Sequence, residues 1–322
     1  MRARAGVGRG LGGPGVRHRA LRERSRVPAI LVRVPVSAVL FDLDDTLLDA
    51  EAAWRSGVGE LVAIRAPGLG LDLTTAIQAW GEVFPEWFER YLVGEISMQA
   101  SRAGRIRDWS RLLGLQVRDG EEAAWFDSYV AGYQRGWAPF ADVLPALTAL
   151  APLPLGLVTN GDGIQQRQKV AALGLESRFA AVVVSSDVGV PKPDPAIFLA
   201  AASALRVDPA ECVMVGDLLD RDVAGALAAG MGAVWLRRPD GPQADMVVPQ
   251  ELAGRFQTLA TLVELPAVLA SWPDGVEAVG VDAVGVDAVG VDAVGVEAVG
   301  VEAVGVDAVG VDAVGVDAAA GA

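Results

Sequence analysis

Five short apolar runs, separated by helix-patterned stretches, constrain the fold of this 322-residue chain more than any other feature. The runs occupy residues 38–41, 155–158, 181–184, 212–215 and 233–236. Helix-like patterns fill the stretches between the later runs, at 164–173, 196–205 and 223–229. Continuous apolar strands that alternate with helices are typical of a parallel sheet buried on both faces. The sequence therefore predicts an α/β protein with a doubly wound parallel sheet.

A long segment separates the first apolar run from the second. It spans about 110 residues, far more than one crossover helix needs. We therefore expect an α-helical cap inserted at 51–137, with residues 36–50 and 138–274 forming the core and 139–150 leading back to the sheet. Six of the eight tryptophans fall in the insertion, where most of them are expected to pack its own core: Trp54, Trp80, Trp87, Trp109, Trp125 and Trp137.

Both ends of the chain differ from this body in composition. Residues 1–35 hold nine Arg and one Glu without periodicity, which predicts a disordered extension, or alternatively a mis-assigned start codon. Its apolar runs are too short for a signal peptide or a membrane span. Residues 275–322 repeat five residues nine times. A period of five produces no amphipathic face, which favours disorder, with a short β-solenoid as the alternative.

Scarce residue types exclude several classes of site. The only histidine is His18, in the Arg-rich extension, so catalytic triads and His-ligated zinc are excluded from the body. The only cysteine is Cys212, in an apolar run, which predicts a buried structural thiol and a reducing, cytoplasmic location. The chain has two lysines, Lys169 and Lys192, against 25 arginines. A lysine retained in so Arg-rich a chain hints at a role that arginine cannot fill.

The net charge of the chain indicates which kinds of partner it can bind. The net charge is -14, and residues 36–274 carry -13 of it, which argues against a nucleic-acid surface on the core. No membrane partner is expected. A small phosphorylated molecule remains compatible with an acidic protein if a local positive pocket binds it. The sequence does not indicate an oligomeric state.

Polar side chains follow the predicted strands at the points where they end. Because a ligand of an open α/β sheet binds beyond the carboxyl ends of its strands, these side chains are expected to converge. They are Asp42, Asp44, Asp45 and Thr46 after the first run, Thr159 and Asn160 after the second, Lys192 and Asp194 in a later loop, and Asp217 and Asp222 after the fourth. A capped, solvated loop is the alternative for the acids after the first run. The convergence of all four groups favours chemistry.

These residue types fit phosphoryl transfer. Hard oxygen ligands without His or Cys select a hard cation, most simply Mg²⁺. One Asp can then attack phosphorus to form an aspartyl-phosphate, and a second can donate a proton to the leaving oxygen. Lys192 and Thr159 are suited to hold the phosphoryl oxygens.

Four segments of the chain resemble the motifs of one known superfamily. "FDLDDTL", "VTNG", "GVPKPDPAIF" and "VGDLLDRDVAGALAAG" are similar, in this order, to the four motifs of the haloacid dehalogenase (HAD) superfamily. The resemblance covers about 36–265 and implies that Asp42 is the nucleophile and Asp44 the acid/base. The cap position resembles that of the C1-capped phosphatases. The run "TNGDGIQQRQK" is similar to the branch of nucleotidases and N-acylneuraminate-9-phosphatases.

The same resemblance implies the binding residues. Thr159, Asn160 and Lys192 would contact the substrate phosphoryl group. Asp217 would bind Mg²⁺ together with the Asp42 side chain and the Asp44 carbonyl, and Asp222 would support the metal site. The function predicted is Mg²⁺-dependent hydrolysis of a small phosphorylated metabolite, a nucleotide or a sugar phosphate.

Other reactions of the superfamily are alternatives. The dehalogenases lack an acid two residues after the nucleophile, whereas this chain has Asp44, which favours a phosphatase. A sugar-phosphate mutase shares both acids and stays open, as does a HAD scaffold that only binds partners. Substrate contacts in the cap could come from Trp54, Arg55, Arg90 or Arg105, although surface arginines and core tryptophans are the default.

Overall fold

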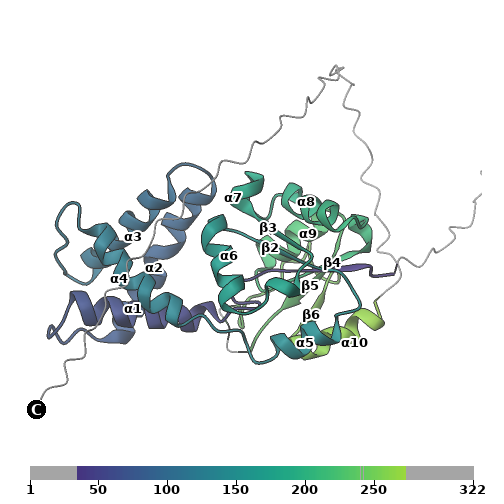
Figure 1. Cartoon of the computed structure of the whole chain (residues 1–322), viewed down its shortest axis with the longest axis horizontal. Coiled ribbons are helices and arrows are strands. Elements are labelled where there is room, and N and C mark those ends of the chain that lie inside the picture. Colours follow the sequence, from purple (N-terminus) through teal and green to yellow (C-terminus); the bar gives the residue numbers. More distant parts are fainter. Residues whose placement is uncertain (1–34, 240, 242, 273–322) are drawn as a thin grey trace, which may run out of the picture. The chain divides into compact units, whose positions relative to one another are not determined.

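The computed structural model of the chain describes residues 35–239, 241 and 243–272. The predicted N-terminal extension, apart from residue 35, and the predicted repeat tail lie outside the described residues. In the described part, an inserted group of four helices interrupts an α/β core (Figure 1).

The core contains one sheet of six parallel strands in the order β3-β2-β1-β4-β5-β6. The strands are β1 (Ala38–Phe41), β2 (Leu155–Thr159), β3 (Ala181–Val184), β4 (Cys212–Gly216), β5 (Gly232–Leu236) and β6 (Gln257–Leu259). The first five confirm the apolar runs of the sequence. The sequence analysis missed β6, because its three residues form no apolar run and two of them are exposed.

Helices cover both faces of the sheet. In chain order they are α5 (Val143–Ala149), α6 (Gly163–Ala172), α7 (Ser185–Val188), α8 (Pro195–Leu205), α9 (Ala224–Ala228) and α10 (Leu265–Ala270), with 3-10 turns η1 (Glu176–Arg178), η2 (Pro209–Glu211) and η4 (Leu262–Glu264). Side chains of β1 alternate between the faces. Val39 and Phe41 pack with α5, α6 and α10, whereas Ala38 and Leu40 pack with α8 and α9. The doubly wound sheet of the prediction is confirmed.

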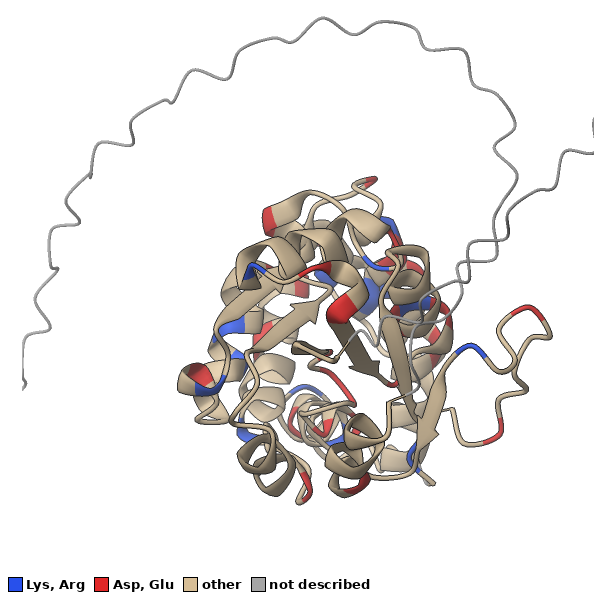
Figure 2. Cartoon of the chain, turned by 90° about the vertical axis from the view of Figure 1, so that its right-hand side faces the viewer, with Lys and Arg blue, Asp and Glu red and all other residues tan. Residues whose placement is uncertain are grey.

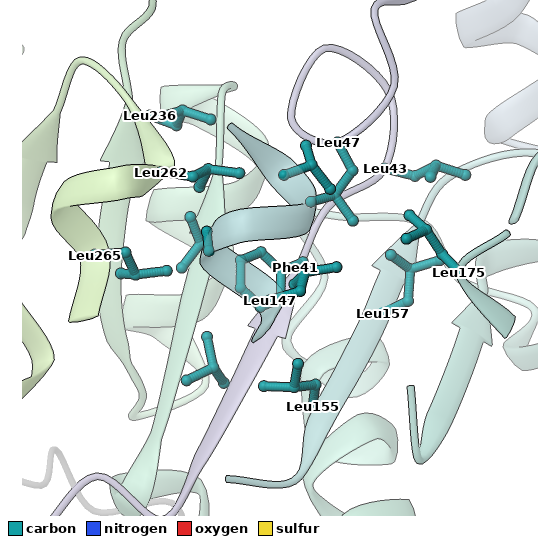
Figure 3. Packing of buried hydrophobic residues seen from close by; sticks show 14 of the residues in the cluster. Phe41, Leu43, Leu47, Leu147, Leu155, Leu157, Leu175, Leu236, Leu262 and Leu265 are labelled. Atoms are coloured by element: carbon teal, nitrogen blue, oxygen red, sulfur yellow. The ribbon is translucent and has the colours of Figure 1, made fainter. Parts of the chain in front are cut away.

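The first of these faces is packed mainly with aliphatic side chains. Figure 3 shows Phe41 next to Leu147 of α5, with leucines of β2 and α10 around them, Leu155, Leu157 and Leu265. All five are buried. Burying side chains of this size contributes about 1.5–3 kcal/mol each, so this layer holds the first strand firmly in the middle of the sheet.

The inserted region has a hydrophobic core of its own. Its helices are α1 (Ala50–Arg65), α2 (Leu73–Leu92), α3 (Met98–Leu112) and α4 (Glu122–Arg135). Trp80, Trp109 and Trp125 are buried in this core, which confirms the expectation for these tryptophans, and Trp54, Trp87 and Trp137 pack against it. A glycine allows α1 and α4 to approach closely, since a Cβ on Gly132 would lie 2.5 Å from the Ser56 carbonyl oxygen.

A π-helical turn precedes one of the predicted helices. The helix predicted over 223–229 is confirmed as the short α9 (Ala224–Ala228), and the turn η3 (Leu219–Val223) lies directly before it. The wider turn holds Asp222 directly behind β4. Leu218 N–H donates to the Asp222 carboxylate at 2.9 Å, while Asp222 N–H donates to the Leu218 carbonyl at 2.8 Å. Periodicity in the sequence did not reveal this turn, because its five residues, LDRDV, are too few to show a helical pattern.

Charged residues are spread over this body. In the view of Figure 2, acidic and basic positions alternate over the helices and loops of the described part without a continuous basic face. None of the helices that the structure describes combines the length and the apolar character that a membrane crossing requires.

Candidate active site

Most of the polar side chains predicted to converge meet at one edge of the sheet, whereas Asp194 is exposed and caps α8, accepting from the Ala196 N–H at 2.8 Å. Strand β1 lies between β2 and β4, where the strand order reverses, and such a switch point leaves a crevice at the carboxyl ends. The ladder continues one residue beyond β1, since Asp42 N–H donates to the Val215 carbonyl at 2.9 Å. This bond brings Asp42 next to the end of β4.

Three buried carboxylates form a cluster at this point. One oxygen from each of Asp42, Asp217 and Asp222 lies within 4.8 Å of the other two. Gly216, the last residue of β4, allows this approach, because a Cβ there would lie 2.3 Å from Asp222 Cγ. Asp217 is anchored through its carbonyl, which accepts from Trp235 Nε1 at 2.7 Å.

Lys192 bridges two members of the cluster. Its Nζ donates to Asp42 Oδ1 at 2.5 Å and to Asp222 Oδ1 at 2.6 Å, and its side chain is 3 % exposed. Asn160 holds the Lys192 backbone from both sides. The Asn160 amide donates to the Lys192 carbonyl at 3.1 Å, and Lys192 N–H donates to Asn160 Oδ1 at 2.8 Å. In this structure, Asn160 therefore positions the lysine.

Electrostatics in the cluster are dominated by burial. Loss of hydration raises the pKa of Asp42 to about 7, although Lys192 opposes the shift. Burial, reinforced by the charges of Asp222 and Asp42, raises the pKa of Asp217 well above its usual range. Burial alone would lower the pKa of Lys192, but Asp222 and Asp42 raise it above its ordinary value. Lys192 is therefore charged, but its single positive charge is not enough to stabilise the ionised forms of the buried carboxyl groups around it.

The Asp44 side chain contacts a different lysine. Lys169 Nζ, on α6, donates to Asp44 Oδ1 at 2.7 Å and to Oδ2 at 2.8 Å. One turn earlier, Gln166 Nε2 donates to Asp44 Oδ2 at 3.0 Å and to Thr159 Oγ1 at 2.6 Å. Gln166 and Lys169 are buried. Residues three apart lie on the same face of a helix, so both reach Asp44 together.

Asp45 has a structural task. Its Oδ1 accepts from the N–H groups of Ala50 at 3.0 Å and Glu51 at 3.2 Å, at the beginning of α1. Burial and the neighbouring Asp44 charge raise the pKa of Asp45 to about 7. The three adjacent acids thus contact three different partners: the acidic cluster, α6 and α1. A solvated loop does not describe Asp42, which is 5 % exposed.

Lys169 and Gln166 are the site residues that the sequence analysis missed. One signal was available, because Lys169 is one of only two lysines in the chain. Its contact with Asp44 could not be inferred, since the two residues are 125 positions apart and meet only through the placement of α6 behind β2.

The cap residues considered as substrate contacts fall into two groups. Arg55 pairs with Glu51 and Arg90 with Glu95 on the surface, as the default expectation had it. Trp54 packs its ring 4.7 Å from that of Phe84. Arg105 differs from them, because it is buried and has no acidic partner among the described residues.

The acidic cluster fits a hard divalent cation. Three buried carboxyl groups face one ammonium group, so ionisation of all three would leave two negative charges without compensation within the cluster. All its potential side-chain ligands are oxygen atoms, the type that Mg²⁺ and Ca²⁺ prefer. Burial is the main cause of the raised pKa of Asp217, and a divalent cation would favour its ionised form and offset the added repulsion from Asp222 and Asp42.

A doubly wound sheet with an acid directly after β1, a buried acid cluster at the switch point and a helical insertion defines a class of α/β hydrolytic enzymes. The model of the haloacid dehalogenase-like hydrolases matches residues 36–230, and the chain belongs to this family.

Relatives with known names share most of this region. A glyceraldehyde 3-phosphate phosphatase from Methanopyrus kandleri is 36 % identical over 70 % of this chain and 99 % of its own length. The N-acylneuraminate-9-phosphatase from Rattus norvegicus is 32 % identical over 73 % of this chain and 94 % of its own, which confirms the resemblance to that branch. Among solved structures, a 2-haloacid dehalogenase from Pseudomonas syringae pv. Tomato DC3000 is 29 % identical, covers 74 % of this chain and 100 % of its own, and has a TM-score of 0.51.

Proposed function

We propose that this chain is a Mg²⁺-dependent phosphatase that hydrolyses a small phosphomonoester through an aspartyl-phosphate on Asp42. One observation carries the proposal: Asp42 lies in a buried acidic cluster beside Lys192, while Asp44, two residues on, is held apart by α6. Asp42, Asp217 and Asp222 would hold the cation, together with the Asp44 carbonyl. When bound, Mg²⁺ would neutralise the phosphoryl oxygens and orient them.

The reaction then proceeds in two displacements. An Asp42 carboxylate oxygen attacks phosphorus, the bond from phosphorus to the ester oxygen breaks, and Asp44 donates a proton to the leaving alcohol. In the second step Asp44 takes a proton from water. The resulting hydroxide attacks phosphorus, inorganic phosphate leaves, and the Asp42 carboxylate is restored. Lys192 and Thr159 would stabilise the charge on the phosphoryl oxygens.

Lys169 and Gln166 would position Asp44 for both proton transfers. Together they bind both oxygens of its carboxylate, and Gln166 also ties it to Thr159. A proton donor displaced by about 1 Å can lose about a hundredfold in rate, so this fixation has kinetic value. We assign both residues a positioning role.

The substrate class follows the family of phosphatases to which the two curated relatives belong. Their names give glyceraldehyde 3-phosphate and N-acylneuraminate 9-phosphate as substrates, both phosphorylated metabolites. We propose a sugar phosphate or a nucleotide for this chain. Asp44 argues against dehalogenation, because ester hydrolysis needs a proton donor for the leaving oxygen and displacement of a halide does not.

The experiment combines metal removal with trapping of the intermediate. The purified full chain is assayed with p-nitrophenyl phosphate in Mg²⁺ and in EDTA, and the protein is quenched in acid during turnover. We expect hydrolysis only with the metal, and a phosphoryl group on the peptide that contains Asp42.

Two results would contradict the proposal. Turnover that is unchanged in EDTA would remove the metal assignment. Turnover without a phosphorylated peptide, even in a variant with slowed second step such as Asp44→Asn, would remove the covalent route. Transfer of the phosphoryl group to another sugar phosphate, without release of phosphate, would instead identify a mutase.

A further inference from the structure

Arg105, on α3 of the cap, is a buried cation in an aromatic cage. It is 5 % exposed, and its Cζ lies 5.9 Å from the ring centre of Trp80, 5.1 Å from that of Phe84 and 5.1 Å from that of Phe126. Its Nε has no hydrogen-bond partner among residues 35–239, 241 and 243–272. Within the described part of the chain, no carboxylate pairs with this guanidinium.

No described acidic side chain therefore balances the charge of Arg105. Burial lowers its pKa to about 10, and the groups that act on it besides burial are two tyrosine phenols and the like-charged Arg102. At neutral pH the guanidinium remains protonated. Rings stabilise a cation only partly, and a buried ion without a counter-ion is costly. The side chain has the properties expected of a group that receives its anion from a ligand.

Two stacked tyrosines connect this cage with the catalytic edge of the core. Tyr129 stacks on Trp80 at 4.3 Å between ring centres and on Tyr133 at 5.4 Å. Lys169 Nζ, which binds Asp44, lies 5.6 Å from the centre of the Tyr133 ring. The rings of Tyr129 and Tyr133, both on α4, thus link the surroundings of the acid/base with those of Arg105.

The pKa of Tyr133 supports this placement. Burial raises it well above its ordinary value, the Asp44 charge raises it further, and the Arg105 charge lowers it.

We propose that Arg105 binds a carboxylate on the alcohol part of the substrate, so that the enzyme selects phosphomonoesters that carry a second negative charge. This inference rests on the proposed phosphatase function and specifies its substrate. A guanidinium presents paired N–H donors in one plane, which matches the two oxygens of a carboxylate. Such a contact, made away from the reacting phosphorus, would act mainly on binding.

The test uses two matched series of substrates. One consists of phosphate esters of ω-hydroxy carboxylic acids with increasing chain length, and the other of the corresponding ω-hydroxyalkyl phosphates, in which CH₂OH replaces the carboxylate. We expect the full chain to prefer the acids at one chain length, through a KM lower by about tenfold or more. A third series with a second phosphate in place of the carboxylate distinguishes the two kinds of anion.

Variants assign the preference to Arg105. Arg105→Met should raise KM for the preferred acid by about tenfold or more, while kcat and the hydrolysis of p-nitrophenyl phosphate stay near wild type. Arg105→Lys should restore part of the preference, because it keeps the charge but loses the planar fork. Arg107→Met is the matched control, since Arg107 lies on the same helix but is half-exposed and paired with Glu122.

A binding measurement separates this proposal from the proposed function. Tryptophan fluorescence is titrated with the acid and its neutral partner in EDTA, where no turnover is expected. Equal affinity for both, or the same preference in Arg105→Met, overturns the role of Arg105 even if hydrolysis is normal. Stronger binding of the bisphosphates than of the acids overturns the choice of a carboxylate. The thermal midpoint of Arg105→Met provides a further check. Removal of an unpaired buried charge should leave this midpoint unchanged or raise it. A purely structural Arg105 predicts instead that the midpoint falls and that activity drops equally for all substrates.

Discussion

The core and the cap differ in how they treat buried positive charge. In the core, Lys169 and Lys192 contact carboxylates at 2.5–2.8 Å. In the cap, Arg105 is surrounded by aromatic rings and has no acidic partner among the described residues. The core lysines are paired with carboxylates of the protein itself. The charge of the cap arginine is, in the proposal above, paired only when a substrate carboxylate binds.

This difference assigns the reaction steps to the core and the selection of the substrate to the cap. The proton transfers and the covalent bond need groups at short, constant distances, which the ends of neighbouring strands provide. Selection needs a charge that is satisfied only when the correct substrate is present. The physical cost of an unpaired buried cation is tolerable in the cap because its own aromatic core, with Trp80 and Trp109 fully buried, supplies the stability.

The largest loss of turnover is expected for a substitution in the buried acidic cluster of the core. Asp42→Asn keeps the shape of the side chain but removes the nucleophile, so turnover should fall by about 10⁴-fold or more and the phosphorylated peptide should vanish. Asp49→Asn is the matched control, because Asp49 caps α1 through the N–H of Ala52 and is not a member of the buried acidic cluster. Steady-state assays and acid-quench trapping measure both. Residual turnover close to wild type in Asp42→Asn would place the nucleophile elsewhere.

A second effect tests the positioning of Asp44. Lys169→Met should lower turnover of alkyl phosphates by about a hundredfold and that of aryl phosphates much less, because good leaving groups need little protonation. Gln168→Met, at an exposed position of the same helix, should change neither. The comparison of kcat for the two substrate types is the measurement. Equal losses for both types would make Lys169 a general structural residue.

Substitution of two closely packed glycines, one in the core and one in the cap, allows a direct comparison of the two regions. A Cβ at Gly216 would lie 2.3 Å from Asp222 Cγ in the core, and one at Gly104 would lie 2.4 Å from the Trp87 ring in the cap. Each substitution by Ala should lower the free energy of unfolding by about 1–3 kcal/mol through overpacking. Only Gly216→Ala should also raise the Mg²⁺ concentration needed for half-maximal activity. A raised Mg²⁺ requirement in Gly104→Ala would mean that the cap takes part in the metal site.

The smallest effect is expected for an ion pair of the core that is less deeply buried. Asp142 accepts from Arg238 at 3.0 and 3.1 Å, from Thr261 Oγ1 at 2.7 Å and from Leu262 N–H at 2.9 Å. Burial alone would raise the pKa of Asp142, but these hydrogen bonds outweigh it and lower the pKa. Asp142→Asn should cost about 1 kcal/mol at neutral pH, since solvent screens part of the interaction.

The sign of this pKa shift determines how the effect varies with pH. A carboxyl whose pKa is lower in the folded state stabilises the protein above its unfolded pKa, ordinarily 3.8, and loses that contribution as the pH falls through the folded value. Unfolding in urea should therefore show a constant difference between wild type and Asp142→Asn at neutral pH, which shrinks in acid. A difference that grows as the pH falls would contradict the lowered pKa.

Much of the core was predictable because its signals are local. The five apolar runs are confirmed as parallel strands, and the insertion is confirmed as helical, since continuous apolar runs and their spacing reflect burial directly. The strand β6 was missed, because Gln257–Leu259 is too short to show a pattern. The helix predicted over 223–229 is confirmed as α9, whereas the π-helical turn η3 before it was missed.

The sequence by itself determined which residue types stand at the ends of the strands, and with them the edge where Asp42, Asp217 and Lys192 meet. Parallel strands end at one edge of a sheet, so order along the chain is enough to predict that meeting. Only the tertiary structure decided that Lys169 donates hydrogen bonds to Asp44 and that Arg105 is buried without an acidic partner among the described residues. Both depend on how helices far apart in the sequence are placed over the sheet and over one another, and this placement results from side-chain packing across the whole molecule rather than from any local pattern.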